Sequence, residues 1–269
     1  MKVQFKIARI NFSTSISEIS SGVENHTMED GTRLDIHDDN PGSKESVGYG
    51  KEVVRGTDLF FIIFDGRDEK TLSKLEAEID ILSSPRISKA AVITLVEYND
   101  SESTDNNNQL RNLSKQYGLK YTKTSDLSTD FFLEKITEFL PDLMEKKYPV
   151  NYAMTLLKND DLKESEIARS IHTTLERLPQ NGEKSQAISN LIIKMKDSLT
   201  PQKLISKIKN PESELYNTLN QHSKKQKISY VGLQQGFFSS KTRSLLHAEN
   251  ALKADEKRFN ESFSADYPK

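Results

Sequence analysis

Two uninterrupted apolar runs, at residues 59–64 (LFFIIF) and 90–96 (AAVITLV), constrain the fold of this chain more than any other feature. A run that is apolar on both faces is typical of a central parallel strand covered on both sides. Between the runs, Leu72, Leu75, Ile79 and Leu82 recur at helical spacing, and Pro85 predicts the end of that helix because proline disfavours helical geometry in the preceding residue. The order strand, helix, strand predicts the centre of an α/β sheet.

The flanking segments extend this pattern. Apolar and charged residues nearly alternate over 3–10, which predicts a strand, and Asp30-Gly31 predicts a tight hairpin turn with a positive φ at Gly31. Further along, we expect a helix over 107–117 that ends at Gly118, a strand over 119–122 and a helix over 129–146. These elements predict an α/β domain over 1–147, with a doubly wound, mostly parallel sheet.

The pattern changes at about Tyr148, and every later periodic segment has helical spacing. A proline that follows Thr200 is at a position where the first turn of a helix tolerates it. We therefore expect an all-α helical domain over 148–269. Its predicted helices cover 165–178, 183–199, 200–210, 211–222 and 239–259, with a basic, glycine-containing connection at 224–236.

Charge and composition exclude several classes of function. The chain carries 38 basic and 40 acidic side chains, so no excess of positive charge predicts a nucleic-acid partner. It has no cysteine, which excludes disulfides, thiolate metal ligands, a cysteine nucleophile and a prenylated C-terminus. The N-terminus is interrupted by charges and no segment holds about 18 consecutive apolar residues. We expect a soluble, cytoplasmic protein without stable membrane insertion.

Six segments in the first half of the chain resemble motifs of a Rab-type small GTPase. No single match is specific, but all six follow the order and spacing of that family. The segment at 38–42 has one residue more than the family's Asp-x-x-Gly motif. The resemblance implies a small G domain, a fold that normally binds GTP. The six segments are 20–24 (SSGVE), 29–31 (EDG), 38–42 (DDNPG), 50–58 (GKEVVRGTD), 65–72 (DGRDEKTL) and 117–125 (YGLKYTKTS).

The motifs that would hold the nucleotide are missing. A phosphate-binding loop wraps phosphates in backbone N–H groups and neutralises them with a lysine, but residues 11–19 contain neither glycine nor lysine and are too few for the loop and its helix. The family's Asn-Lys-x-Asp guanine reader is replaced by 97–100 (EYND), its catalytic glutamine by Ser43, and the alanine after Thr124-Ser125 by Asp126. The resemblance therefore implies a pseudo-GTPase without a nucleotide cofactor.

The resemblance also assigns residues to two groups. No catalytic residue and no metal ligand is expected. The remnants of the nucleotide-binding motifs are Ser20, Asp38, Gly42, Thr124 and Ser125. The face that meets partners in the family supplies the candidate partner-binding residues, which are Gly22, Val23, Glu24, Ser43, Val47 and Tyr49.

Other patterns invite a comparison with enzymes and metal sites. Asp65, at the end of an apolar run, resembles the nucleophile of haloacid dehalogenase-type phosphatases, but Arg67 stands where that motif needs a second aspartate. Asp38 and Asp39 could hold magnesium, yet without substrate phosphates to complete the shell we expect a solvated turn. The histidines include no i, i+4 pair, which predicts surface or satisfied core positions rather than zinc ligands. They are His26, His37, His172, His222 and His247.

The C-terminal segment from 236 onward resembles the C-termini of effectors that intracellular bacteria export by type IV secretion, with Glu249, Glu256 and Glu261 in its polar stretch. Together the two resemblances imply a non-catalytic protein-interaction module, a bacterial effector that engages host membrane-trafficking proteins in the host cytoplasm. Two alternatives stay open. One is an enzyme with its chemistry in the helical half or at the domain junction, and the other is an atypical G domain that binds GTP weakly. The oligomeric state is left open as well.

Overall fold

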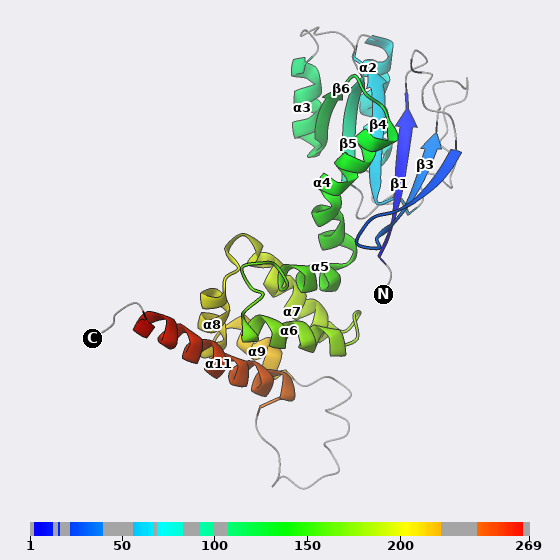
Figure 1. The fold of residues 1–269 in the computed structure, drawn as a ribbon. Coiled ribbons are helices and arrows are strands. Elements are labelled where there is room, and N and C mark those ends of the chain that lie inside the picture. The colour runs from blue at the N-terminus through cyan, green and yellow to red at the C-terminus, as the bar shows by residue number, and fades with distance from the viewer. Residues whose placement is uncertain are drawn as a thin grey trace. The chain divides into compact units, whose positions relative to one another are not determined.

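The computed structural model describes residues 3–12, 16, 22–39, 56–66, 69–82, 92–98, 107–221 and 241–265. The chain divides into two compact units, Met1–Lys147 and Tyr148–Lys269, of which the first is α/β and the second helical (Figure 1). The elements described in the first unit are β1 (Gln4–Asn11), β2 (Gly22–Thr27), β3 (Arg33–Asp39), β4 (Leu59–Asp65), α2 (Glu69–Leu82), β5 (Val92–Tyr98), α3 (Asn107–Tyr117), β6 (Lys120–Thr124) and α4 (Thr129–Lys147).

The first unit is built on a six-stranded sheet in the order β2-β3-β1-β4-β5-β6. All neighbouring strands run parallel except the edge strand β2, which pairs antiparallel with β3. The two apolar runs form β4 and most of β5, and β4 is buried along its whole length, as expected for a strand covered on both faces. This doubly wound α/β architecture confirms the predicted fold class and is compatible with the small G domain that the sequence resembles.

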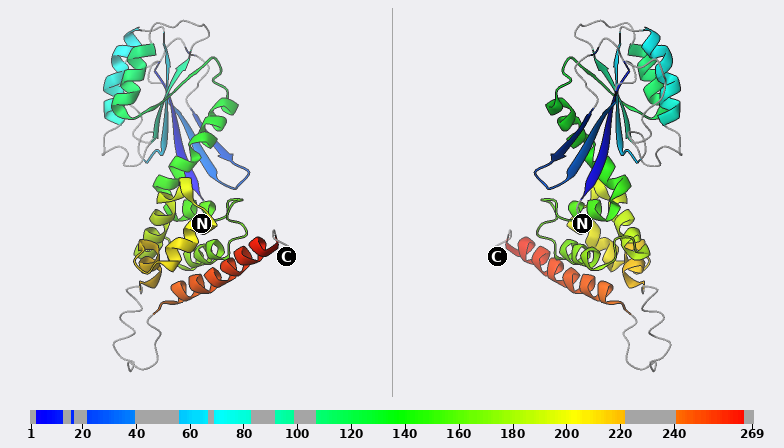
Figure 2. Two further views of the ribbon diagram at one scale, coloured as in Figure 1. Left: turned by 90° about the vertical axis from the view of Figure 1, so that its left-hand side faces the viewer. Right: turned by 90° about the vertical axis from the view of Figure 1, so that its right-hand side faces the viewer.

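Helices cover both faces of this sheet. α2 and α3 lie on one face and α4 on the other (Figures 1 and 2). Because successive strand residues point to opposite faces, Phe60, Ile62 and Phe64 of β4 join the core under α2 and α3. Phe61 points to the opposite face, where its ring centroid lies 5.1 Å from that of Phe132 on α4.

Two predicted glycine positions have the expected backbone. Gly31 has a φ of 82° and its N–H donates to the carbonyl of Met28, which closes the hairpin turn between β2 and β3. Gly118 has a φ of 63° and ends α3. Its N–H donates to the carbonyl of Lys115, and the next N–H donates to the carbonyl of Ser114, which is the hydrogen-bond pattern of a Schellman cap.

The second unit consists of helices around one apolar core. Four of its described helices begin at a side-chain cap, because Ser165, Thr200, Ser213 and Thr242 each accept a hydrogen bond from an N–H three residues ahead. Its described elements are α5 (Pro149–Leu156), α6 (Glu166–Arg177), α7 (Glu183–Lys194), the 3₁₀ helix η2 (Lys196–Ser198), α8 (Pro201–Lys209), α9 (Glu214–Asn220) and α11 (Arg243–Ala265).

Several predicted boundaries in this unit were wrong. The sequence analysis gave no helix before 165, whereas Pro149 occupies the first turn of α5 and Val150 and Ala153 are buried. The helix predicted over 183–199 ends at Lys194 and continues as η2, and α11 is displaced toward the C-terminus relative to 239–259. The basic connection at 224–236 lies outside the described residues. Among the helices that the structure describes, none is long and apolar enough to cross a membrane.

Candidate functional site

The carboxyl edge of the sheet is where an open α/β fold binds its ligands, outside the ends of the parallel strands. Strands β1, β3, β4, β5 and β6 all end at this edge. The remnant Asp38 is the second-last residue of β3, and the remnant Thr124 is the last residue of β6. Ser125 follows directly after β6. The fold therefore places three of the five predicted remnants along one edge of the sheet. The other two, Ser20 and Gly42, lie outside the described residues.

Asp38 is engaged by a second buried side chain, Arg9 of β1. The guanidinium donates from Nε to Oδ1 at 2.5 Å and from Nη2 to Oδ2 at 2.6 Å, a bidentate pair. The two residues are partners in the parallel register of β1 and β3, so both side chains point to the same face of the sheet. Each side chain is only 6% exposed. A carboxylate that the resemblance assigns to the nucleotide site is thus neutralised by the chain itself.

Further contacts hold the guanidinium in place. Nη2 of Arg9 also lies 3.4 Å from Oε2 of Glu24 on β2, and the guanidinium carbon lies 5.0 Å from the ring centroid of Phe132 on α4. Arg9 therefore joins strands β1, β2 and β3 to the helix that covers their face. The sequence analysis did not single out Arg9. The signal for its burial was its position on the strand. Arg9 alternates with Phe5 and Ile7, so it points to the same face as these two fully buried residues.

The expectation of a solvated turn at Asp38 and Asp39 was wrong. Both residues belong to β3 and both are buried. As successive strand residues they point to opposite faces of the sheet, so the two carboxylates do not converge on one ion. Among the described residues, no group of three or more histidine, aspartate or glutamate side chains could hold a metal ion.

The end of β6 forms a local turn. Thr124 Oγ1 accepts a hydrogen bond from the N–H of Asp126 at 2.9 Å. The carboxylate of Asp126 accepts from the N–H of Ser128 at 2.7 Å and from its hydroxyl at 2.9 Å. Ser125 is exposed. These bonds lead the chain into the N-terminus of α4, so in this structure Thr124 and Asp126 shape the turn.

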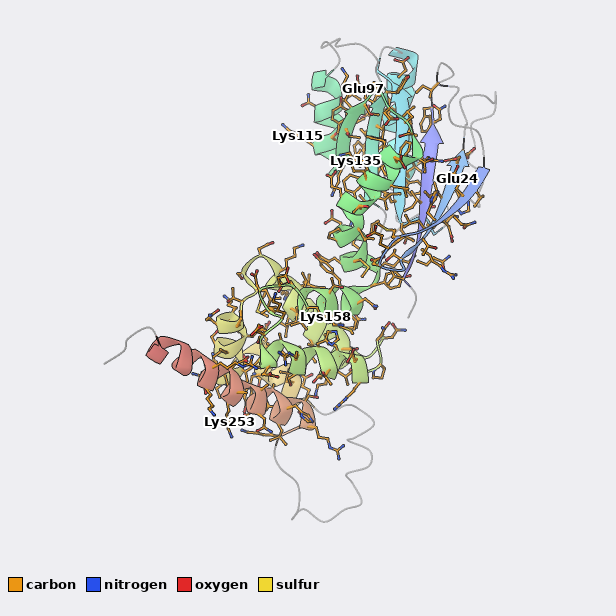
Figure 3. All side chains as sticks on the ribbon, viewed as in Figure 1. Glu24, Glu97, Lys115, Lys135, Lys158 and Lys253 are labelled. Carbon is orange, nitrogen blue, oxygen red and sulfur yellow. The ribbon has the colours of Figure 1, made fainter. Side chains whose placement is uncertain are left out.

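At the end of β5, Glu97 lies at the position that the resemblance assigns to guanine recognition. Its side chain is buried and accepts a hydrogen bond from the hydroxyl of Tyr121 on β6. The neighbouring Gly66 leaves room for it, because a Cβ at this position would clash with Oε1 of Glu97. Glu97 is one of the residues labelled in Figure 3. This carboxylate fills the space at the edge between β4 and β6.

The predicted partner-binding residues that are described lie on β2. This strand is at the edge of the sheet, with β3 on one side only, and most of its residues are exposed. Val23 is 60% exposed and is the apolar side chain among these residues. Glu24 lies on the same strand (Figure 3). The candidates Ser43, Val47 and Tyr49 lie outside the described residues.

The histidines show one departure from the prediction. His172 of α6 is buried, and its Nε2 has no hydrogen-bond partner among the described residues, so it is not a satisfied core residue there. Burial is the main cause that lowers its pKa below the ordinary value, with Lys158 acting in the same direction. The pKa of His37 on β3 is lowered as well, first by burial and then by Lys6. His222 lies outside the described residues.

No protein-family model matches the chain, and the search of curated proteins finds no match to its sequence. The geometry of the sheet edge and the surface of β2 are therefore the features that bear on function.

Proposed function

We propose that this protein is a non-catalytic interaction module, in which a Rab-like pseudo-GTPase domain binds a protein partner without using a nucleotide. The observation that carries the proposal is the buried pair of Arg9 and Asp38. In the resemblance, Asp38 belongs to the motif that serves the nucleotide. Here both oxygens of its carboxylate accept hydrogen bonds from a guanidinium.

A second argument concerns the connection between β1 and β2. Asn11 ends β1 and Gly22 begins β2, so ten residues join the two strands. Within that connection, the carbonyl of Ile16 accepts a hydrogen bond from Nδ2 of Asn11 at 2.8 Å, and the Ile16 side chain is buried. A buried apolar side chain at Ile16 supports the proposal that no triphosphate is bound at this position.

The surface we propose for the partner is the outer edge of β2 with Val23 and Glu24. An exposed edge strand offers unpaired backbone N–H and C=O groups, to which an extended segment of another protein can add as a further strand. Val23 supplies apolar contact beside these groups. Since no γ-phosphate would order or release this surface, we propose that it stays in one state.

The nucleotide part of the proposal is tested with a fluorescent GTP analogue and magnesium, added to the full-length protein and followed by fluorescence polarisation. A small GTPase with an intact phosphate-binding loop serves as the positive control. We expect no saturable binding at micromolar concentration of the chain. Binding at a micromolar or lower Kd would overturn the pseudo-GTPase proposal and favour the atypical G domain instead.

The interaction part is tested by affinity capture from a eukaryotic lysate, followed by mass spectrometry. From the two resemblances, we propose that the protein is a bacterial effector and that its partners are host membrane-trafficking proteins. The variant Val23→Glu should lose these partners, because it places a charge in the middle of the proposed surface. The matched control is Ile81→Glu, since Ile81 is 44% exposed but lies on α2. Equal capture by both variants would argue against the β2 surface.

The C-terminal helix bears on the proposed secretion signal. Glu249 forms an ion pair with Lys241 at 2.6 Å, and Glu256 forms one with Lys209 of α8. Leu245 on the same helix is fully buried in the core of the helical unit. If this segment is read by a secretion system, we propose that α11 must first detach from its unit. Deletion of 241–269 and a secretion assay in a bacterial host would test that reading.

A further inference from the structure

A groove with a volume of about 400 Å³ lies between α6 and α11 in the helical unit. Six residues at helical spacing face it from α6, from Glu166 to Arg177, and four from α11, from His247 to Ala254. Most of these side chains carry a hydrogen-bonding group. A groove between two packed helices is more often closed by apolar residues, so this composition needs an explanation.

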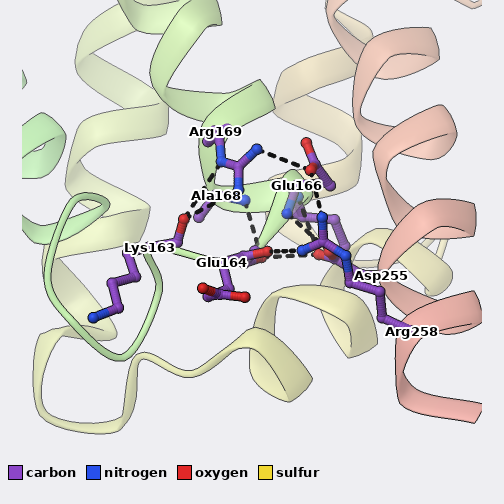
Figure 4. A network of polar contacts seen from close by, with 9 residues as sticks. Lys163, Glu164, Glu166, Ala168, Arg169, Asp255 and Arg258 are labelled. Carbon is purple, nitrogen blue, oxygen red and sulfur yellow. Dashed lines mark hydrogen bonds and ion pairs between the residues drawn. The ribbon is translucent and has the colours of Figure 1, made fainter. Parts of the chain in front are cut away.

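Glu166 and Arg169 of the groove wall belong to a network of polar contacts at the start of α6 (Figure 4). Oε1 of Glu166 lies 2.9 Å from Nη1 of Arg169 and 3.1 Å from Nη2 of Arg258. Beside them, the carboxylate of Asp255 accepts hydrogen bonds from the hydroxyl of Ser165 and from the N–H groups of Glu166 and Ile167. The carboxylate of Glu166, the acidic residue on the groove wall, is therefore neutralised by two guanidinium groups.

Beyond this network, the groove wall carries donors that nothing in the described part of the chain uses. Oγ of Ser170 is buried and has no hydrogen-bond partner in the part of the chain that the structure describes. Arg177, in the last turn of α6, forms no ion pair or hydrogen bond with any residue that the structure describes. Thr173 and Asn250 line the same space. An unpaired buried hydroxyl costs free energy unless a ligand or water satisfies it, so its place on the wall points to an occupant.

Charge indicates the sign of that occupant. Residues 148–269 contain 19 lysine and arginine against 14 aspartate and glutamate side chains, a formal charge of +5, whereas residues 1–147 contain 19 against 26, a charge of −7. Such an asymmetry between the two parts of a chain favours an anionic ligand for the basic part. Within the groove, Arg177 is a cation without a counter-ion among the described residues.

We propose that the groove between α6 and α11 binds a small phosphorylated organic molecule. Arg177 would hold the phosphate, because a planar guanidinium pairs with two phosphate oxygens at once. Ser170 Oγ, Thr173 and Asn250 would donate to its remaining oxygens. The volume exceeds what a single inorganic ion fills, and Ala251 on α11 provides a small apolar wall for the rest of the ligand. This proposal concerns the helical unit and does not depend on the proposed function.

The experiment titrates the full chain by calorimetry with three kinds of probe. These are inorganic phosphate, a set of soluble phosphomonoesters each paired with its parent alcohol, and phosphatidylcholine vesicles with and without phosphatidic acid. We expect binding that requires the phosphate, tighter for at least one soluble ester than for inorganic phosphate. Binding to phosphatidic acid vesicles alone would identify a lipid headgroup as the source of the same chemistry. Absence of phosphate-dependent binding to every probe would overturn the proposal.

Three variants locate the site. Arg177→Gln should weaken binding about tenfold or more, since it removes the bidentate charged donor. Ser170→Ala should weaken binding several-fold without lowering the thermal midpoint of the unliganded protein, because Oγ makes no hydrogen bond to a described residue that its removal would break. Lys253→Gln removes an equal charge from an exposed position on α11 and should stay within about twofold (Figure 3). If Lys253→Gln weakens binding as much as Arg177→Gln, the binding is unspecific and the proposed site is wrong.

Discussion

Replacing Arg9 with methionine tests whether the buried pair is a structural substitute for a ligand. The variant leaves the carboxylate of Asp38 buried beneath α4 without its two charge-assisted hydrogen bonds. Breaking a buried ion pair by removing one partner costs about 3–5 kcal/mol. The double variant Arg9→Met/Asp38→Leu removes both charges and fills the space with apolar groups, which is often neutral or stabilising by about 1–4 kcal/mol. We therefore expect the double variant to be more stable than Arg9→Met.

Hydrogen exchange measured by mass spectrometry is the suitable assay, because the chain has no tryptophan and its two units need not unfold together. Peptides from β1 and β3 report on the α/β unit. A loss of 3–5 kcal/mol corresponds to exchange that is faster by about 10² to 10⁴-fold, at 1.4 kcal/mol for each factor of ten. Peptides from α6 and α7 serve as the internal control. The reasoning fails if Arg9→Met changes exchange in β1 by less than about tenfold, or if the double variant is as unstable as the sum of the single ones.

Two further predictions concern the helical unit. Burial lowers the pKa of Lys184 from 10.5 to about 8, and its Nζ donates to the carbonyls of Leu219 and Gln221. The unfolded chain therefore binds more protons between pH 8 and 10.5, and the free energy of unfolding should rise with pH across that window relative to Lys184→Met. A pKa shift of this size corresponds to a change of about 3.4 kcal/mol in the free energy of unfolding. Solvent screening of the half-buried side chain reduces this change to about 1–2 kcal/mol. The prediction is contradicted if the free energies of unfolding of the wild-type protein and of Lys184→Met, measured in urea, change with pH in parallel. Asp255→Ala should cost about 2–4 kcal/mol, because it leaves the N–H groups at the start of α6 without acceptors, whereas the exposed Lys253→Ala should change stability by less than about 0.5 kcal/mol.

Local sequence signals predicted most of the α/β unit. Gly31 and Gly118 were found because turns and helix ends impose a backbone conformation that glycine adopts without strain. The strands β4 and β5 were found because burial on both faces leaves a continuous apolar run. These features depend on residues that are close in the sequence. The short helix α5 was missed, although Pro149 in its first turn was a signal for a helix start.

The parts that were not predicted depend on pairing between distant residues. Arg9 meets Asp38 only because β1 and β3 are neighbours in a particular register. The same holds for Asp255, which caps a helix that begins about ninety residues earlier in the chain. Periodicity in one segment carries no information on such pairs. The expectation of a solvated turn at Asp39 was wrong for this reason. Asp39 is part of β3 because it pairs with β1, a strand that is far away in the sequence.

The bonds around Thr242 have a practical consequence. The N–H of Thr242 donates to Oδ1 of Asn220 at 3.0 Å, and Nζ of Lys184 donates both to the carbonyl of Gln221 and to Oγ of Ser244. The chain just before residue 222 and the chain just after residue 240 are therefore held close together by hydrogen bonds within the helical unit. Lengthening a connection costs only about 0.6 kcal/mol for each doubling of its length. A reporter domain inserted between 222 and 240 would therefore leave these hydrogen bonds intact. That junction is the natural position for a label on this protein.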